Sequence, residues 1–181
     1  MSETQESKVE VKIEPGEIGN FLNKNGVSST PLGKDSSNIE MLEISGSDLL
    51  KACELLKKSP ETDFNYLVLV TTIDLQKGYQ SVYLLESLNT KKMVRIKVTV
   101  DKENPVLPSV NHIWRTADWY EREAFDMMGI KYTGHPDLKR ILNPDNWEGF
   151  PLRKDYVPPS DSLNGPHPLA ETEYAERTLQ K

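Results

Sequence analysis

The fold is decided by residues 66–100, YLVLVTTIDLQKGYQSVYLLESLNTKKMVRIKVTV, which contain three segments rich in β-branched and aromatic residues. Segment 66–75 is almost entirely apolar or β-branched, a composition typical of a central strand. Segment 79–88 follows a turn-forming stretch, and segment 92–100 alternates apolar with charged residues, as a half-buried strand does. We therefore predict an antiparallel meander of three strands.

Helical and extended patterns alternate before this meander. Residues 16–27 carry apolar side chains at helical spacing and predict a short helix, whereas the polar stretch 30–38 predicts a loop. Residues 39–45 predict a strand, and Ser47 is expected to cap a second helix over 48–59. This order predicts an α+β fold, with an antiparallel or mixed sheet that carries helices on one face.

The pattern changes after the meander. Residues 109–115 and 118–129 predict two helical pieces, the second capped by Asp118 and ended by Gly129. From Lys131 onward we find no regular periodicity, yet the aromatic and aliphatic content is too high for a free tail. We expect an extended, largely irregular C-terminal segment that wraps a partner.

These patterns divide the chain into three parts: a flexible acidic leader over 1–16, an α+β domain over 17–130 and the partner-wrapping segment over 131–181. The leader lacks the apolar centre of a signal peptide and the arginine-rich, acid-poor character of a transit peptide. We therefore expect the protein to work in a cytosol-like compartment.

Composition excludes several classes of function. The net charge of −6 argues against general nucleic-acid binding, which needs a cationic surface. No stretch approaches the roughly 18 apolar residues of a membrane span, so membrane association is expected only through a partner. Cys53 is the one cysteine, so the chain cannot form an internal disulfide, an iron–sulfur cage or a zinc knuckle from thiolates.

A charged cluster occupies residues 118–142, DWYEREAFDMMGIKYTGHPDLKRIL, and has two interpretations: an acid/base or metal site, or a charged surface that holds a partner. In a helix, Glu121 and Glu123 are two positions apart and diverge by about 200°, so they do not converge as a catalytic pair. Aspartates four positions either side of Arg122 would instead form an intrahelical ion-pair ladder.

Metal and nucleophile sites find little support in the sequence. The three histidines, His112, His135 and His167, do not pair at the spacings of helical metal sites. Cys53 lies on the apolar face of its helix, where packing is its expected role. Arg153 and Lys154, in the stretch PLRKDY, can grip an anionic patch or form a solvated turn, and composition leaves both open.

A family resemblance bears on these alternatives. WYEREAFDMMGIKYTGHPDLKRIL (119–142) resembles the signature of the thirty-kilodalton subunit family of respiratory complex I, a component of its peripheral arm. In that pattern an E-R-E core precedes an acidic residue, an apolar pair with glycine, a histidine and a basic residue before two aliphatics. GFPLRKDY (149–156) resembles the second landmark of the family. The resemblance covers roughly residues 113 to 157, and the upstream part agrees in layout only.

The stretch between the two motifs is similar to one branch of the family. The run from Trp147 to Tyr156 resembles the chloroplast and cyanobacterial branch, called subunit J of NAD(P)H-quinone oxidoreductase. The respiratory bacterial branch usually lacks that tryptophan. The acidic leader favours a cyanobacterial member over a plastid one.

The resemblance implies a non-catalytic subunit that docks onto the large quinone-site subunit, near the iron–sulfur subunits I and K. It implies no cofactor in this chain, with iron–sulfur clusters and plastoquinone in partner subunits and ferredoxin as the donor to the complex. The implied location is the cytoplasmic side of the thylakoid membrane, in photosynthetic cyclic electron flow and proton pumping. The implied interface residues are Glu121, Arg122, Glu123, Asp126, His135, Lys139, Arg140, Trp147, Arg153, Lys154, Asp155 and Tyr156.

Three alternatives remain beside this interpretation. One is the thirty-kilodalton subunit of a respiratory complex I that uses NADH and ubiquinone or menaquinone. Another is a free-standing hydrolytic or metal enzyme built on Glu121, Glu123 and His135, and a third is an adaptor outside any redox complex. On the subunit interpretation, Arg122→Ala or Arg153→Ala should leave the isolated domain folded while depleting the assembled complex.

Overall fold

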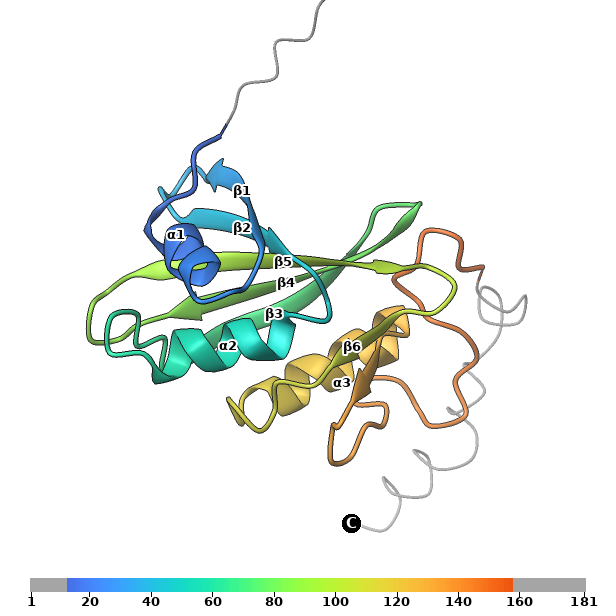
Figure 1. Cartoon of the computed structure of the whole chain (residues 1–181). Coiled ribbons are helices and arrows are strands. Elements are labelled where there is room, and N and C mark those ends of the chain that lie inside the picture. The colour runs from blue at the N-terminus through green and yellow to red at the C-terminus, as the bar shows by residue number, and fades with distance from the viewer. Residues whose placement is uncertain (1–12, 158–181) are drawn as a thin grey trace, which may run out of the picture.

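The computed structural model describes residues 13–157 and shows a five-stranded mixed sheet with helices packed against it (Figure 1). The first part of the expected leader and residues 158–181 lie outside the described residues. The strands lie in the order β1-β2-β5-β4-β3. Their bounds are β1 Ser29–Lys34, β2 Glu40–Ile44, β3 Tyr66–Asp74, β4 Gly78–Glu86 and β5 Met93–Asp101.

The predicted meander is confirmed, because β3 pairs antiparallel with β4 and β4 with β5. β2 joins the far side of β5 in parallel. A parallel neighbour needs a crossover connection, and the chain from β2 to the meander supplies it with helix α2, Leu49–Lys58. Leu42, Ile96 and Tyr83 stand in register across three strands and are fully buried, so they mark the core face of the sheet.

The first strand of the meander lies at the edge of the sheet, where the sequence predicted a central strand. Its apolar composition has a different cause. Helix α3, Ala117–Met128, packs beside β3, and the Tyr120 hydroxyl donates to the carbonyl of Val68 at 2.8 Å. A covered edge strand buries apolar side chains and protects its unpaired backbone groups without a neighbouring strand.

Three helices of the described chain bury their apolar residues in one core with the sheet. The first predicted helix is present as α1, Glu17–Lys24, and the carboxylate of Glu40 on β2 accepts hydrogen bonds from the amides of Ile18 and Gly19 at 3.0 and 2.9 Å. A carboxylate at a helix N-terminus satisfies free donors and favours the helix dipole. The predicted fold class of helices on one face of a mixed sheet is confirmed.

Two predicted helix caps are wrong. Helix α2 begins after Asp48 with no side-chain cap, because the Ser47 hydroxyl contacts that of Ser45 at 2.5 Å instead. Helix α3 begins after Thr116, ahead of the predicted cap at Asp118. The predicted end at Gly129 is confirmed, since this residue has φ 76° in the left-handed region that favours glycine.

Short elements account for the other differences. The predicted loop 30–38 begins as β1, which pairs with β2 through an irregular register between Pro31 and Lys34. Residues 109–115 form turns where a helical piece was predicted. Strand β6, Val106–Pro108, pairs in parallel with β7, Lys131–Thr133, and neither was predicted. A strand of three residues is too short to show a periodicity in the sequence. The partners of β6 and β7 are also distant in sequence, so no local pattern indicates their pairing.

We call residues 134–157, which follow β7, the strap. The strap has no helix or strand and runs along α3 and the end of β3 (Figure 1). Within residues 13–157, no helix has the length and apolar character needed to cross a bilayer.

Candidate functional site

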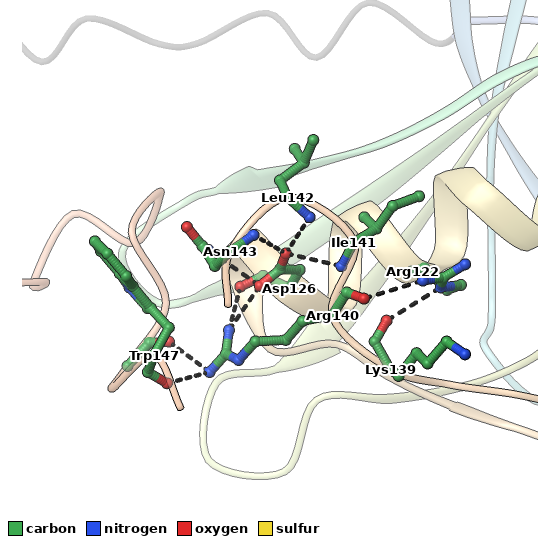
Figure 2. A network of polar contacts seen from close by, with 9 residues as sticks. Arg122, Asp126, Lys139, Arg140, Ile141, Leu142, Asn143 and Trp147 are labelled. Atoms are coloured by element: carbon green, nitrogen blue, oxygen red, sulfur yellow. Dashed lines mark hydrogen bonds and ion pairs between the residues drawn. The ribbon is translucent and has the colours of Figure 1, made fainter. Parts of the chain in front are cut away.

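The carboxylate of Asp126 on α3 lies at the centre of the signature residues and is fully buried (Figure 2). One of its oxygens accepts hydrogen bonds from three successive strap amides, those of Ile141, Leu142 and Asn143, at 3.1, 2.8 and 2.8 Å. The other oxygen accepts from Arg140 Nη1 at 2.7 Å and from Asn143 Nδ2 at 3.0 Å. A buried charge needs this degree of hydrogen bonding to be stable.

The environment of Asp126 favours its charged form. Burial by itself raises the pKa of the carboxyl, but the hydrogen bonds from Asn143, Arg140 and Leu142 outweigh burial and hold the pKa below its usual range. The group is therefore an anion that organises the strap around itself.

Two arginines of the signature, one on α3 and one on the strap, donate hydrogen bonds to backbone carbonyls where the strap meets α3. Arg140 reaches the carbonyl of Asp126 at 3.0 Å and those of Trp147 and Gly149 at 2.9 and 3.1 Å (Figure 2). Arg122 donates to the carbonyls of Lys139 and Arg140 at 3.2 and 3.0 Å. The predicted ladder of Arg122 with its neighbouring aspartates does not form, because the strap carbonyls take the guanidinium donors.

The second motif closes the C-terminal end of α3. Arg153 Nε donates to the carbonyl of Met128 at 2.8 Å, and the amide of Leu152 donates to that of Met127 at 3.1 Å. These bonds satisfy carbonyls that the helix itself leaves without partners. The Arg153 guanidinium also lies 4.3 Å from the ring centre of Phe150 and 5.0 Å from that of Tyr79, in cation–π geometry.

The remaining residues of this motif contact the end of β3, the residue after β5 and the strap itself. The amide of Lys154 donates to Asp74 at 2.9 Å, while its side chain is exposed. Asp155 pairs with Lys102 at 2.9 Å, and the ring of Tyr156 lies against Gly149. Hydrogen bonds from the Lys154 and Gln76 amides hold the pKa of Asp74 below its usual range.

The hydrolase alternative requires three side chains to converge: Glu121, Glu123 and His135. The structure places them in different environments. Glu121 is fully buried, whereas Glu123 faces solvent, so the two carboxylates do not converge. Glu121 accepts hydrogen bonds from the Ser109 hydroxyl at 2.5 Å and the Val110 amide at 2.7 Å. His135 Nε2 lies 3.9 Å from Glu121, too far for a hydrogen bond. No group of three metal-ligating side chains occurs among residues 13–157.

The structure therefore joins Arg122, Asp126, Arg140 and Arg153 in internal contacts between α3 and the strap. Lys139 pairs with Asp137 at 2.7 Å at the surface, and Trp147 is half-buried with its carbonyl on Arg140. Sequence reasoning missed Asn143, Ser109 and Phe150. Their roles depend on contacts between distant segments, for which the sequence has no local signal.

The arginine substitutions need a revised expectation. Arg122 and Arg153 both bind carbonyls inside the chain, so Arg122→Ala or Arg153→Ala would loosen the strap before any effect on a partner. These variants do not separate docking from folding. A probe of docking has to lie on an exposed side chain that makes no internal polar contact.

Gly129 tests whether strap packing depends on its lack of a side chain. A Cβ at Gly129 would meet Arg153 Nη2 and lie 2.7 Å from Phe150 Cε2, whereas one at Gly134 would meet nothing within 4 Å. Both glycines have positive φ, so alanine at either carries a similar backbone strain of about 1 kcal/mol. We expect Gly129→Ala to lower the free energy of unfolding by about 1–3 kcal/mol more than Gly134→Ala in urea titrations. Equal losses would show that the strap does not pack on this residue.

Comparison with known proteins identifies the family of this chain. The sequence matches the family described as the 30 kDa subunit of respiratory-chain NADH dehydrogenase over residues 42–162, which include the meander, α3 and the strap. The chain belongs to this family. It is thus a 30 kDa-type subunit of a respiratory complex and acts together with other subunits in electron transport.

Two solved structures show the same fold. The trypsin-resistant fragment (1-134) of Nqo5 is 24% identical, with a TM-score of 0.56, and the match covers 66% of this chain and 95% of that one. A chain of the membrane-bound sulfane sulfur reductase, an archaeal respiratory membrane complex, is 19% identical with a TM-score of 0.65. That match covers 77% of this chain and 83% of the other. At these identities the likeness concerns the fold.

Proposed function

We propose that the chain is a non-catalytic peripheral-arm subunit that docks onto the large quinone-site subunit of a proton-pumping complex I-like oxidoreductase. The family match through α3 and the strap carries this proposal. The network around Asp126 supports it, because these charged groups bind one another and the backbone and leave no converging pair for catalysis. The chain itself holds no cofactor in this account, and partner subunits bind the iron–sulfur clusters and the quinone.

Exposed apolar side chains indicate where the partner binds. Apart from Ile13 and Leu88, the large exposed apolar side chains of the described residues lie on or beside β3, on α3 or on the strap. We call this set the exposed apolar edge: Tyr66, Ile73, Leu75, Trp119, Leu142, Leu152 and Val157. Leu152 lines a shallow groove with Thr71 of β3 and Glu123 of α3, so strap, helix and strand meet there. Exposed apolar side chains with charged neighbours are typical of a protein interface. Glu123, Lys139, Lys154 and Asp155 are the exposed charges of the signature that would form this rim.

The finer assignment is the photosynthetic branch, subunit J. Its support is the run from Trp147 to Tyr156, which resembles that branch. In this assignment the complex lies on the cytoplasmic side of the thylakoid membrane, and this chain lies next to subunits I and K. The complex takes electrons from ferredoxin and reduces plastoquinone in cyclic electron flow. The competing assignment is the thirty-kilodalton subunit of a respiratory complex I that uses NADH and ubiquinone or menaquinone.

Purification of the intact assembly distinguishes the two assignments. The chain is tagged in the cells that make it, and the co-purifying subunits and extracted quinone are identified by mass spectrometry. We expect the large quinone-site subunit, subunits I and K, plastoquinone, and quinone reduction driven by reduced ferredoxin. Ubiquinone or menaquinone with NADH-driven turnover would assign the respiratory branch, and recovery of the chain without a large subunit would contradict docking itself. The purified chain alone should show neither turnover nor stoichiometric metal in elemental analysis.

Trp119 offers a clean probe of docking, because its side chain is 70% exposed. We expect Trp119→Ala to change the free energy of unfolding of the isolated chain by less than about 0.5 kcal/mol. Loss of a buried interface tryptophan typically costs about 2 kcal/mol or more, so the affinity for the large subunit should fall about thirtyfold. Ile13→Ala is the matched control, since Ile13 is exposed beside Gly33 on β1, away from this edge. Equal complex abundance for both variants on native gels would place the interface elsewhere.

A further inference from the structure

Glu121 joins three segments of the chain inside the protein. Its carboxylate binds Ser109 and Val110, which precede α3, and it lies beside His135 at the start of the strap. The side chains of both Glu121 and His135 are 0% exposed. The His135 ring in turn contacts Asp118 on the first turn of α3, with Nε2 3.3 Å from Oδ1 and 3.4 Å from the backbone carbonyl.

The groups around Glu121 supply no permanent positive charge. Cys53 of α2, Tyr83 of β4 and Tyr132 of β7 face it from the core. Asp118 adds a negative charge on its own helix. Of the residues that the structure describes, no lysine or arginine interacts with this carboxyl. A buried carboxylate without a cation costs several kcal/mol, whereas the protonated acid does not.

The hydrogen bonds of His135 determine where a neutralising proton resides. The amide of Asp137 donates to His135 Nδ1 at 3.1 Å, so this nitrogen has no hydrogen and Nε2 carries the ring proton toward Asp118. A second ring proton would break the bond to Asp137. Burial without a cation therefore favours the neutralising proton on Glu121.

We propose that Glu121 is a buried proton-binding site that secures the root of the strap, residues 134–137, to α3 when occupied and loosens it when empty. Loss of the proton leaves a negative charge among Ser109, His135 and Asp118, and the charge is relieved only by water entry or by rearrangement of the imidazole. Either change disturbs the bonds that His135 makes to Asp118 and Asp137. Burial, the dominant cause, raises the pKa of Glu121 to about 7, so occupancy changes near neutral pH.

This inference concerns the isolated chain and does not depend on docking, so the two fail separately. Carbon-13 NMR of carboxyl-labelled glutamate in the full chain measures occupancy directly between pH 4 and pH 9. We expect one glutamate signal that titrates near neutral pH and is lost in Glu121→Gln. The amide of glutamine reproduces the donor and acceptor of the protonated acid, so this variant is expected to fold.

Hydrogen exchange of the strap root measures the consequence. After correction for intrinsic rates, protection of residues 134–137 should fall about tenfold or more between pH 6 and pH 8.5 in the wild type. It should stay constant in Glu121→Gln, while Glu123→Gln, an exposed carboxyl on the same helix, should behave as the wild type does. Titration of the Glu121 signal below pH 5, or protection that is equally pH-dependent in Glu121→Gln, would overturn the proposal. So would a neutral-pH titration with no change in protection.

Discussion

Asp126→Asn is expected to release the strap from α3. An amide at this position places an NH₂ group against either the three strap amides or Arg140, since both carboxylate oxygens face donors. Arg140 also loses its one carboxylate partner among the described residues. Removing one partner of a buried ion pair typically costs about 3–5 kcal/mol. The amides of Ile141, Leu142 and Asn143 should therefore lose their protection in hydrogen-exchange mass spectrometry.

A control on the strap itself makes this result specific. Asp137 is an exposed carboxylate whose partner Lys139 is also exposed. Exposed pairs of this kind contribute about 0–1 kcal/mol, so Asp137→Asn should leave the exchange of these amides close to that of the wild type. Unchanged protection in Asp126→Asn would mean that the strap is held by Phe150 and Arg153 rather than by the carboxylate.

Stability should depend on pH through Glu121, with a sign opposite to that of an ordinary paired carboxylate. Burial raises its pKa in the folded protein from the ordinary value of 4.5 to about 7. The folded state thus binds the proton more tightly than the unfolded state between these values, so unfolding free energy falls as pH rises from 4.5 to 7. A pKa difference of this size corresponds to about 3 kcal/mol.

The difference between the wild type and Glu121→Gln isolates this contribution from all other titrating groups. The two proteins should have similar unfolding free energies at pH 5, and Glu121→Gln should be more stable by about 3 kcal/mol at pH 8. Urea titrations at both pH values measure the difference. Glu123→Gln should show no such divergence, because Glu123 faces solvent. A constant difference between wild type and Glu121→Gln across this range would show that Glu121 is ionised in the folded protein at all these pH values.

Local sequence patterns predicted the longer helices and strands well. They predicted poorly which strands pair with distant partners. The meander and the helix end at Gly129 follow from alternation, turn chemistry and the left-handed conformation of glycine. β3 was placed at the centre because an apolar segment looks the same whether a strand or a helix covers it. β1, β6 and β7 are short strands whose pairing depends on distant partners.

In the candidate site, too, residue identities could be read from the sequence, whereas the contacts between distant residues could not. The family signature named Asp126, Arg140 and Arg153, because residue identity is what a signature records. It did not show that Asp126 binds three successive amides, or that Arg122 and Arg153 bind carbonyls of the same chain. Those contacts join residues 15 to 25 positions apart, as in Asp126 with Ile141 and Met128 with Arg153. No local periodicity encodes such pairs.

A cryo-EM map of the assembled complex tests the central claim most directly, namely that the Asp126 network holds the strap so that the exposed apolar edge can dock. The account predicts that Trp119, Leu142 and Leu152 are covered by the large quinone-site subunit, with the hydrogen bonds from Ile141–Asn143 to Asp126 intact. A map in which these three side chains face open water, or in which the strap has left α3, would contradict it.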